Sequence, residues 1–438
     1  MIQFAKENII LFILIHIAFG FLAEFSFFPK PFALLVIIIA ISVVLFSNNK
    51  QEEAFIMATY IVGIEVFLRM VKGAPLFETG KYTTIILLFI GLFIGPTKQK
   101  LTLAFPLYML LLLLGIAFTV VPVGESIRKA VAFNLSGPFM LGICAIYFYK
   151  RRITFNEIYL ASLFFIFPTF SMVTYMYLYT PDLSEIAFGG ASLGETSGGF
   201  GPNQVTTVLG FGMFLVGLFI VFKWKLTGYV FIDVLVLMYF TYRGLLTFSR
   251  GGILTAGVCF VLFFIFIIIY RKDYKNIFKY LVIATLFMTA IWMYTSTVTG
   301  GQIDNRYSGR NATGVKKEDA SSGRLTVILE QFDGFTESPI FGIGVGNGKF
   351  RRLEKGQLVG TSHNEVTRLI EEHGLIGVFA FIMLLFVPIA HFSKQNSLQK
   401  SLVVTFYVFW FLTINHSAMR IAFPGFIYAL SLITIVDD

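Results

Sequence analysis

Apolar residues form long, nearly uninterrupted runs along this chain, and short polar breaks separate the runs. A helix that crosses a bilayer needs about 20 mostly apolar residues. By this measure the sequence predicts about 14 spans. The fourth run is short and is interrupted by Gly91 and Gly95, so a count lower by one or two is the alternative. The predicted spans are 8–26, 31–47, 53–71, 82–95, 101–121, 127–149, 155–180, 203–222, 227–247, 251–270, 277–296, 366–392, 398–414 and 418–436. The pattern therefore predicts an all-α integral membrane protein.

Composition supports the same fold class. Of the 438 residues, 56% are hydrophobic and only 13% are charged, which is too little charge to cover the surface of a soluble protein of this size. The net charge of +9 is therefore not taken as a sign of nucleic-acid binding. Cys144 and Cys259 both lie inside apolar runs, so the sequence predicts neither a disulfide framework nor a cysteine metal site.

The basic residues of the short breaks fall in alternate loops. They are Lys50, Lys98, Lys100, Lys150, Arg151, Arg152, Lys223, Lys225, Arg271, Lys272, Lys275, Lys394 and Lys400. Short loops rich in Lys and Arg stay in the cytoplasm, so both termini are predicted to be cytoplasmic. The sequence thus predicts an N-terminal helix bundle over 1–296, a large outer loop over 297–365, and C-terminal spans over 366–438.

Some cations lie on the outer side in this topology. They include Lys81, Arg243, Arg250 and the arginines and lysines between Arg306 and Lys355. Because a cation placed outside or within a span opposes insertion, these residues suggest that an anion is held there. The alternative is that the charge bias of short loops does not govern a long translocated loop.

Two short motifs lie at the outer ends of predicted spans. In Ser249-Arg250-Gly251-Gly252, the guanidinium offers the planar, paired donors that suit phosphate, and the glycines would let backbone approach a ligand. The alternative is an arginine that extends to the membrane interface. In Pro202-Asn203, Asn203 is predicted to cap the following helix, and a contact to sugar hydroxyls is the second interpretation.

A third block closes the outer loop. Residues 324–336 predict an amphipathic helix with one apolar stripe, and the glycine-rich run 342–348 predicts a tight turn. His363 and Asn364 then lie just before the next span. Taken alone, a histidine at this place is better explained by helix capping or hydrogen bonding at a loop-to-helix junction. The apolar stripe of the predicted helix 324–336 consists of Leu325, Ile328, Leu329 and Phe332.

Together these motifs resemble the bacterial O-antigen ligase and O-antigen polymerase superfamily over roughly residues 200–390. The matching residues are Pro202-Asn203, Ser249-Arg250-Gly251, Arg324, Pro339 with Phe341, Gly342, Gly344 and Gly346, His363-Asn364, and Glu372 with Gly374, Leu375, Ile376 and Gly377. One departure is that the predicted spans outnumber the approximately twelve expected for the ligases, which leaves ligase and polymerase both open.

The resemblance implies a fold of the GT-C-like class and a glycosyltransferase at the periplasmic face of the bacterial inner membrane. The donor would be a saccharide on undecaprenyl diphosphate, and the acceptor a hydroxyl of lipid A–core or of another glycan. The other functions considered are protein O-glycosylation within the superfamily and, from another class, a polysaccharide-lipid flippase or transporter.

The resemblance also implies roles for individual residues. His363 would be the catalytic base, because a histidine with an ordinary pKa near 6.5 is mostly neutral at pH 7. No cofactor and no metal are expected, because the outer loops lack an Asp-x-Asp pair. Arg250 and Arg324, assisted by Arg243 or Arg306, would bind the diphosphate, and Asn203, Asn364, Gly344 and Gly346 would support the site.

Overall fold

The computed structural model of the chain describes residues 1–96, 100–186, 191–272, 274–317, 319, 321, 323–357, 362–393 and 395–437. Lys98 and Lys394, which were counted among the basic loop residues, and part of the predicted outer loop 297–365 lie outside the described residues. The helices are α1 Ile2–Glu7, α2 Ile9–Leu22, α3 Pro29–Ser47, α4 Glu53–Met70, α5 Thr79–Phe93, α6 Ala104–Leu114, α7 Ile127–Phe148, α8 Phe155–Tyr179, α9 Pro202–Phe222, α10 Val230–Leu246, α11 Arg250–Arg271, α12 Ile277–Val298, α13 Gln302–Tyr307, α14 Arg324–Glu337, α15 Gly348–Glu354, α16 Glu365–Phe392, α17 Ser397–His416 and α18 Phe423–Leu430.

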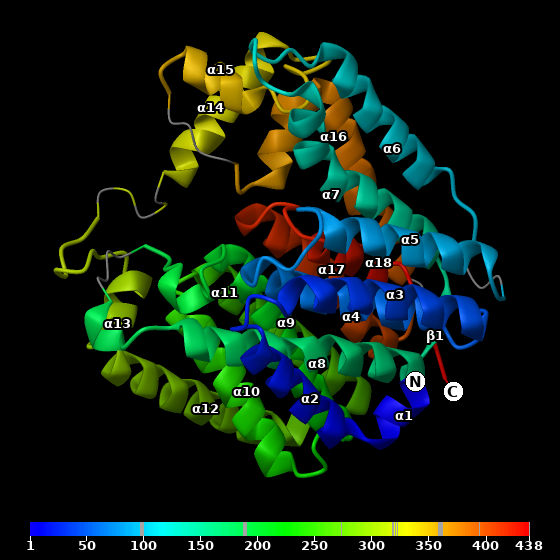
Figure 1. Ribbon diagram of the computed structural model, residues 1–438, viewed down its shortest axis with the longest axis vertical. Helices are drawn as coiled ribbons and strands as arrows, with labels where there is room; N and C mark the ends of the chain where they lie inside the picture. Colours follow the sequence, from blue (N-terminus) through cyan, green and yellow to red (C-terminus); the bar gives the residue numbers. More distant parts are fainter. Residues whose placement is uncertain are drawn as a thin grey trace.

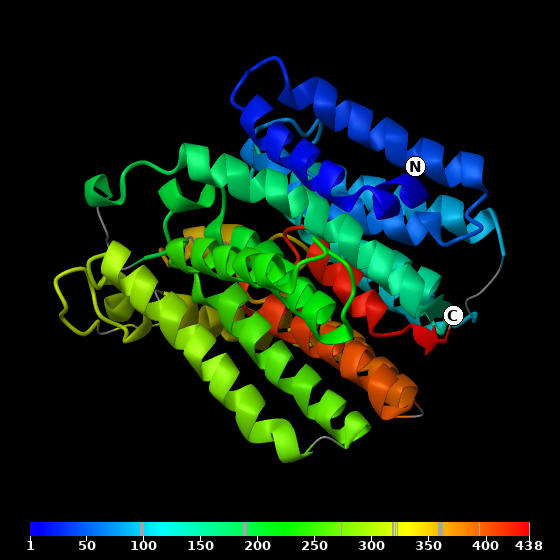
Figure 2. The same ribbon diagram turned by 90° about the horizontal axis from the view of Figure 1, so that it is seen from below.

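The predicted fold class is confirmed. Within the described residues, eight helices are long and apolar enough to cross a membrane, and three shorter apolar helices accompany them. Every predicted span up to 398–414 corresponds to one helix, with ends that differ by a few residues. The long helices lie side by side, and both chain ends lie at the same end of the bundle (Figures 1 and 2).

The last predicted span, 418–436, is not one continuous helix as expected. Its only helix, α18, has eight residues and is therefore about 12 Å long, too short to cross a bilayer. The chain then forms a short strand, β2 Thr434–Val436, which pairs in parallel with β1 Arg152–Thr154. All eight residues of α18 are buried inside the protein. This run is apolar because it fills the protein core, and hydropathy alone does not separate that case from a lipid-facing helix.

Charged side chains within the bundle neutralise one another. A guanidinium nitrogen of Arg69 lies 2.5 Å from a carboxylate oxygen of Glu65, one helical turn earlier, as expected from their spacing. Glu65 also accepts a hydrogen bond from the backbone N–H of Ala422 at 2.6 Å. Lys81, one of the outward cations, lies 2.7 Å from Glu78, so its charge is compensated within the protein. The hydrogen bond between Glu65 and Ala422 fixes α4 to the connection between α17 and α18.

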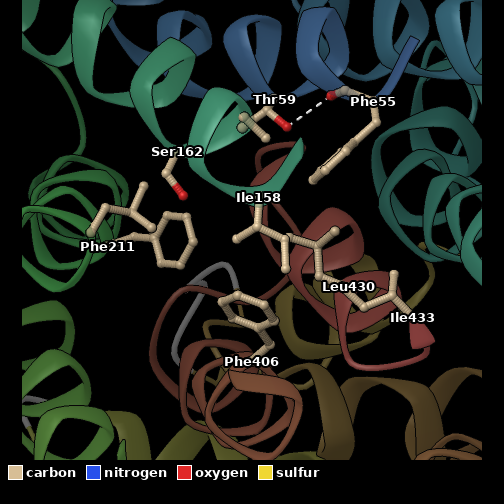
Figure 3. A pocket seen from close by; sticks show the side chains of 10 residues that line it. Phe55, Thr59, Ile158, Ser162, Phe211, Phe406, Leu430 and Ile433 are labelled. Carbon is tan, nitrogen blue, oxygen red and sulfur yellow. Dashed lines mark hydrogen bonds between the residues drawn. The ribbon is translucent and has the colours of Figure 1, made fainter. Parts of the chain in front are cut away.

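A small internal void lies between α4, α8, α9, α17 and α18 (Figure 3). Its volume is about 20 Å³, which is room for about one water molecule. The Thr59 hydroxyl at its edge donates to the carbonyl of Phe55 at 2.8 Å, and most of the other lining side chains are aromatic or aliphatic. We interpret this void as a packing feature of the core.

Candidate active site

Three arginines from separate elements lie near one another. Arg250 begins α11, Arg306 lies in α13, and Arg324 begins α14. The pKa of Arg306 falls to about 10 because the side chain is largely buried and because Arg250 and Arg324 add positive charge nearby. Burial and the charge of Arg250 also lower the pKa of Arg324. Mutually repelling guanidiniums in a partly buried place favour the binding of an anion. We call Arg250, Arg306 and Arg324 the arginine cluster.

The backbone and a neighbouring amide hold this cluster. Arg306 Nε donates to the carbonyl of Phe248 at 2.9 Å, two residues before Arg250. The side-chain oxygen of Asn203 accepts from Ser249 Oγ at 2.8 Å and from Arg324 Nη2 at 3.5 Å. Asn203 therefore connects α9, the residue before α11 and the start of α14.

The prediction that Asn203 caps a helix was wrong. The N-cap of α9 is Gly201, Pro202 follows as the first helical residue, and no side chain caps this end. Asn203 lies one position further into the helix, so its side chain points away from the free backbone N–H groups and is available to Ser249 and Arg324.

The glycines of the Ser249-Arg250-Gly251-Gly252 motif do not open space for a ligand, contrary to the prediction. A Cβ on Gly251 would lie 2.3 Å from the His416 ring, and one on Gly252 would lie 2.1 Å from the carbonyl oxygen of Thr206. The glycines instead let the start of α11 pack directly on α9 and α17. That close packing sets the position of Arg250.

Gly252→Ala is therefore expected to destabilise the protein by about 1–3 kcal/mol, since the new methyl group meets rigid backbone. Thermal unfolding in detergent would measure the change. Gly257→Ala is the matched control on the same helix, because nothing lies within 4 Å of its new Cβ, and it is expected to leave the melting temperature unchanged or higher. Equal melting temperatures for the two variants would contradict this packing role.

His363 lies directly before α16, close to the arginine cluster. Its ring is half-buried, and Nδ1 is buried with no hydrogen-bond partner among the described residues. Burial, followed by the positive charges of Arg324 and Arg420, lowers the pKa of His363 to about 4. The imidazole is therefore neutral at pH 7, which is the form that acts as a base, and the same shift makes it a weaker base than an ordinary histidine.

His363 does not cap α16. Asn364 does, because its side-chain oxygen accepts from the N–H groups of Val366 and Thr367 at 2.9 and 3.1 Å. Its amide nitrogen donates to the Asn415 side chain of α17 at 3.0 Å. The capping role that the sequence left open for the histidine thus belongs to its neighbour.

Contacts on both sides of His363 hold it in place. The carbonyl of Ser362 accepts from Arg420 Nη2 at 3.0 Å. On the helix that follows, Thr367 Oγ1 donates to the side-chain oxygen of Gln331 at 2.7 Å. The histidine is thereby fixed between α14, α16 and the connection after α17.

Arg420 was not among the predicted site residues. It lies in the connection between α17 and α18, and its guanidinium carbon is 4.1 Å from the centre of the Phe133 ring. This arginine lies inside the last predicted span, 418–436. A cation in an apolar run is costly unless it serves a purpose, and that signal could have marked it.

Three predicted site residues lie apart from the cluster. Arg243 of α10 donates to Thr180 Oγ1 at 2.8 Å, beside tyrosines rather than the other arginines. Gly344 and Gly346 adopt positive φ values of 91° and 79°, which glycine tolerates. A Cβ on Gly344 would lie 2.2 Å from the carbonyl oxygen of Phe118, so this turn packs against neighbouring backbone.

The amphipathic helix over 324–336 is confirmed as α14, but its apolar stripe faces away from the protein. Leu325 and Leu329 are each 57% exposed, and Phe332 is 46% exposed. The buried side instead carries Glu330 and Gln331 and packs on α16. In Figure 1, α14, α15 and the start of α16 lie together at one end of the molecule.

One comparison with known proteins gives a match to part of the chain. Residues 235–382 match the family model described as O-antigen ligase. This segment contains the arginine cluster and His363 but neither Asn203 nor Arg420. No curated protein matches the chain. The family match therefore confirms the predicted resemblance: over residues 235–382 this multispan helical protein is similar to the O-antigen ligase family.

Proposed function

We propose that this protein is a glycosyltransferase that moves a saccharide from undecaprenyl diphosphate to an acceptor hydroxyl at the periplasmic face of the bacterial inner membrane. We favour an O-antigen ligase whose acceptor is lipid A–core. The observation that carries the proposal is the position of His363, a neutral imidazole whose Nδ1 has no partner among the described residues, beside the arginine cluster.

In the proposed reaction, His363 takes the proton of the acceptor hydroxyl as its oxygen attacks the anomeric carbon of the donor sugar. The bond between that carbon and the diphosphate oxygen breaks, and its electron pair leaves with the diphosphate. General base catalysis of this kind contributes about 10²–10⁴-fold to a rate.

The arginine cluster has two roles in this reaction. Its guanidiniums bind the diphosphate before the reaction and stabilise the additional negative charge as it departs. Arg324 is positioned for this by its contact with Asn203. Because guanidiniums supply the positive charge, we propose a metal-independent reaction. Arg243 has no part in it, since its hydrogen bond turns it toward Thr180.

A reconstituted assay tests the function. Purified protein in detergent is incubated with undecaprenyl-diphosphate-linked saccharide and lipid A–core, and products are separated by electrophoresis. A glycosidic bond to lipid A–core supports the ligase, whereas saccharide added to a second lipid-linked glycan indicates the polymerase. A transporter forms no bond in this assay, so the absence of both products would overturn the proposal.

The pH dependence of kcat/KM is expected to reflect the lowered pKa of His363. Only the neutral ring acts as a base, and a folded-state pKa of about 4 keeps it neutral down to about pH 5. Activity at pH 5.5 should therefore be within about twofold of that at pH 7.5, whereas an ordinary histidine would lose about tenfold. An acid limb centred near pH 6.5 would contradict the assignment.

A further inference from the structure

A second space lies next to the loop that carries His363. It is a cavity of about 590 Å³ between the start of α7, the connection before α5, the α15 region and the first turns of α16. Ser362, the neighbour of His363, lines this cavity, and so does Arg420. None of the three arginines of the cluster is among its lining residues. We call it the α7–α16 cavity.

Nine charged side chains line the cavity, five cationic and four anionic, and four of them form two ion pairs. Arg352 lies 3.2 Å from a carboxylate oxygen of Glu371, and Arg368 lies 2.5 Å from Glu372. Paired guanidiniums and carboxylates present both hydrogen-bond donors and acceptors in fixed positions, with little net charge. Such a wall suits a ligand with many hydroxyl groups better than it suits a phosphate.

Aromatic rings form another part of the wall. Phe77 and Phe133 both line the cavity, and their ring centres are 6.4 Å apart. A guanidinium lies over one face of each ring, Arg69 over Phe77 and Arg420 over Phe133. Phe77 is still 59% exposed and Phe133 36% exposed, so the uncovered part of each ring is open to a ligand. Ligand sites typically combine apolar walls with a few placed polar groups. A sugar ring fits this combination, because its C–H faces are apolar and its edge carries hydroxyls.

Arg420 connects this cavity with the proposed base. Its guanidinium lies over Phe133 in the cavity wall and donates to the carbonyl of Ser362. The positive charges of Arg324 and Arg420 both lower the pKa of His363. The histidine is thus near the arginine cluster and also near the cavity wall.

We propose that the α7–α16 cavity binds the hydroxyl-bearing end of the acceptor saccharide, while the arginine cluster holds the donor diphosphate. This inference rests on the proposed glycosyltransferase function. The acceptor hydroxyl would then approach His363 past Ser362 and Arg420, from a space separate from the diphosphate. The recognised chemistry is a saccharide end, which both lipid A–core and a lipid-linked glycan can supply.

Filling the cavity tests the inference. Ala132→Trp adds a large ring to the cavity wall on α7, and Ile127→Trp adds the same ring on the same helix at a position 51% exposed and outside the lining. Ala132→Trp is expected to raise the acceptor KM at least tenfold, with donor KM unchanged within twofold. Ile127→Trp should change neither value. The assay is run with two acceptor probes, lipid A–core and undecaprenyl-diphosphate-linked saccharide, and the probe whose KM rises identifies the source of the saccharide.

A gentler pair of variants covers the case in which the tryptophan impairs folding. Phe133→Leu removes the aromatic face but keeps an apolar side chain, and Phe133→Tyr restores the ring. The leucine variant should raise the acceptor KM severalfold, and the tyrosine variant should return it to the normal value. An unchanged acceptor KM in both cavity variants, or a raised donor KM instead, would overturn the inference. Either result leaves the proposed function intact, because that function fails only if no glycosidic bond forms with the unmodified protein.

Discussion

His363→Ala is expected to lower kcat for saccharide transfer by about 10²–10⁴-fold, because the acceptor hydroxyl loses the group that takes its proton. Binding of undecaprenyl diphosphate should persist, since the arginine cluster is unchanged. Single-turnover transfer with purified protein measures the first quantity, and a thermal shift on adding undecaprenyl diphosphate measures the second.

The chain offers a matched control on the same helix. His391 lies near the opposite end of α16, where its Nε2 is 2.8 Å from the carbonyl oxygen of Ile433. His391→Gln removes a histidine far along the helix from the proposed site and is expected to retain transfer within about threefold. Near-normal transfer by His363→Ala, in protein that is inserted and folded, would remove the catalytic role assigned to this residue.

Arg250→Lys is expected to reduce kcat/KM for the donor by about 10–100-fold. Lysine keeps the charge but loses the planar pair of donors that binds two phosphate oxygens together. One charged hydrogen bond is worth about 1.5–3 kcal/mol, which corresponds to that range of rates. Steady-state kinetics with varied donor would measure it.

Arg271→Lys provides the comparison, because Arg271 is the last residue of α11 and Arg250 is the first. The same exchange at the far end of one helix should leave donor kinetics unchanged. If Arg250→Lys also kept full kcat/KM, paired donation from this guanidinium to the diphosphate would be wrong. Attraction between a positive charge at position 250 and the diphosphate would still be compatible with that result.

Much of the fold follows from hydropathy, because a lipid-facing helix must be apolar over its whole length. The run 418–436 shows the limit of that signal. A segment surrounded by other helices, such as α18, is as apolar as one surrounded by lipid. Arg250, Arg324 and His363 stood out in the sequence because ionisable residues are rare in so apolar a chain. The structure brings them near one another, and their roles in the reaction are proposals.

The sequence did not reveal which atoms each of these residues contacts in the folded protein. Gly252 looked available to a ligand, but the backbone of α9 occupies the space beside it. Asn203 was predicted to cap α9, but the N-cap is Gly201, two positions earlier. The side-chain oxygen of Asn203 accepts a hydrogen bond from Ser249 instead. Contacts between elements far apart in the chain decide these roles, and Arg420 was missed for the same reason.

The outward stripe of α14 has a practical consequence. Gln331 on the opposite side of this helix binds Thr367, four residues after His363. Because Leu325, Leu329 and Phe332 are exposed on one side, we expect this helix to lie at the boundary between headgroups and acyl chains. In that position, lipid would hold α14 in place and, through the Gln331–Thr367 hydrogen bond, would help to position His363. Turnover measured in a lipid nanodisc should accordingly exceed turnover in a small detergent micelle. A small micelle is strongly curved and offers α14 no planar bilayer interface.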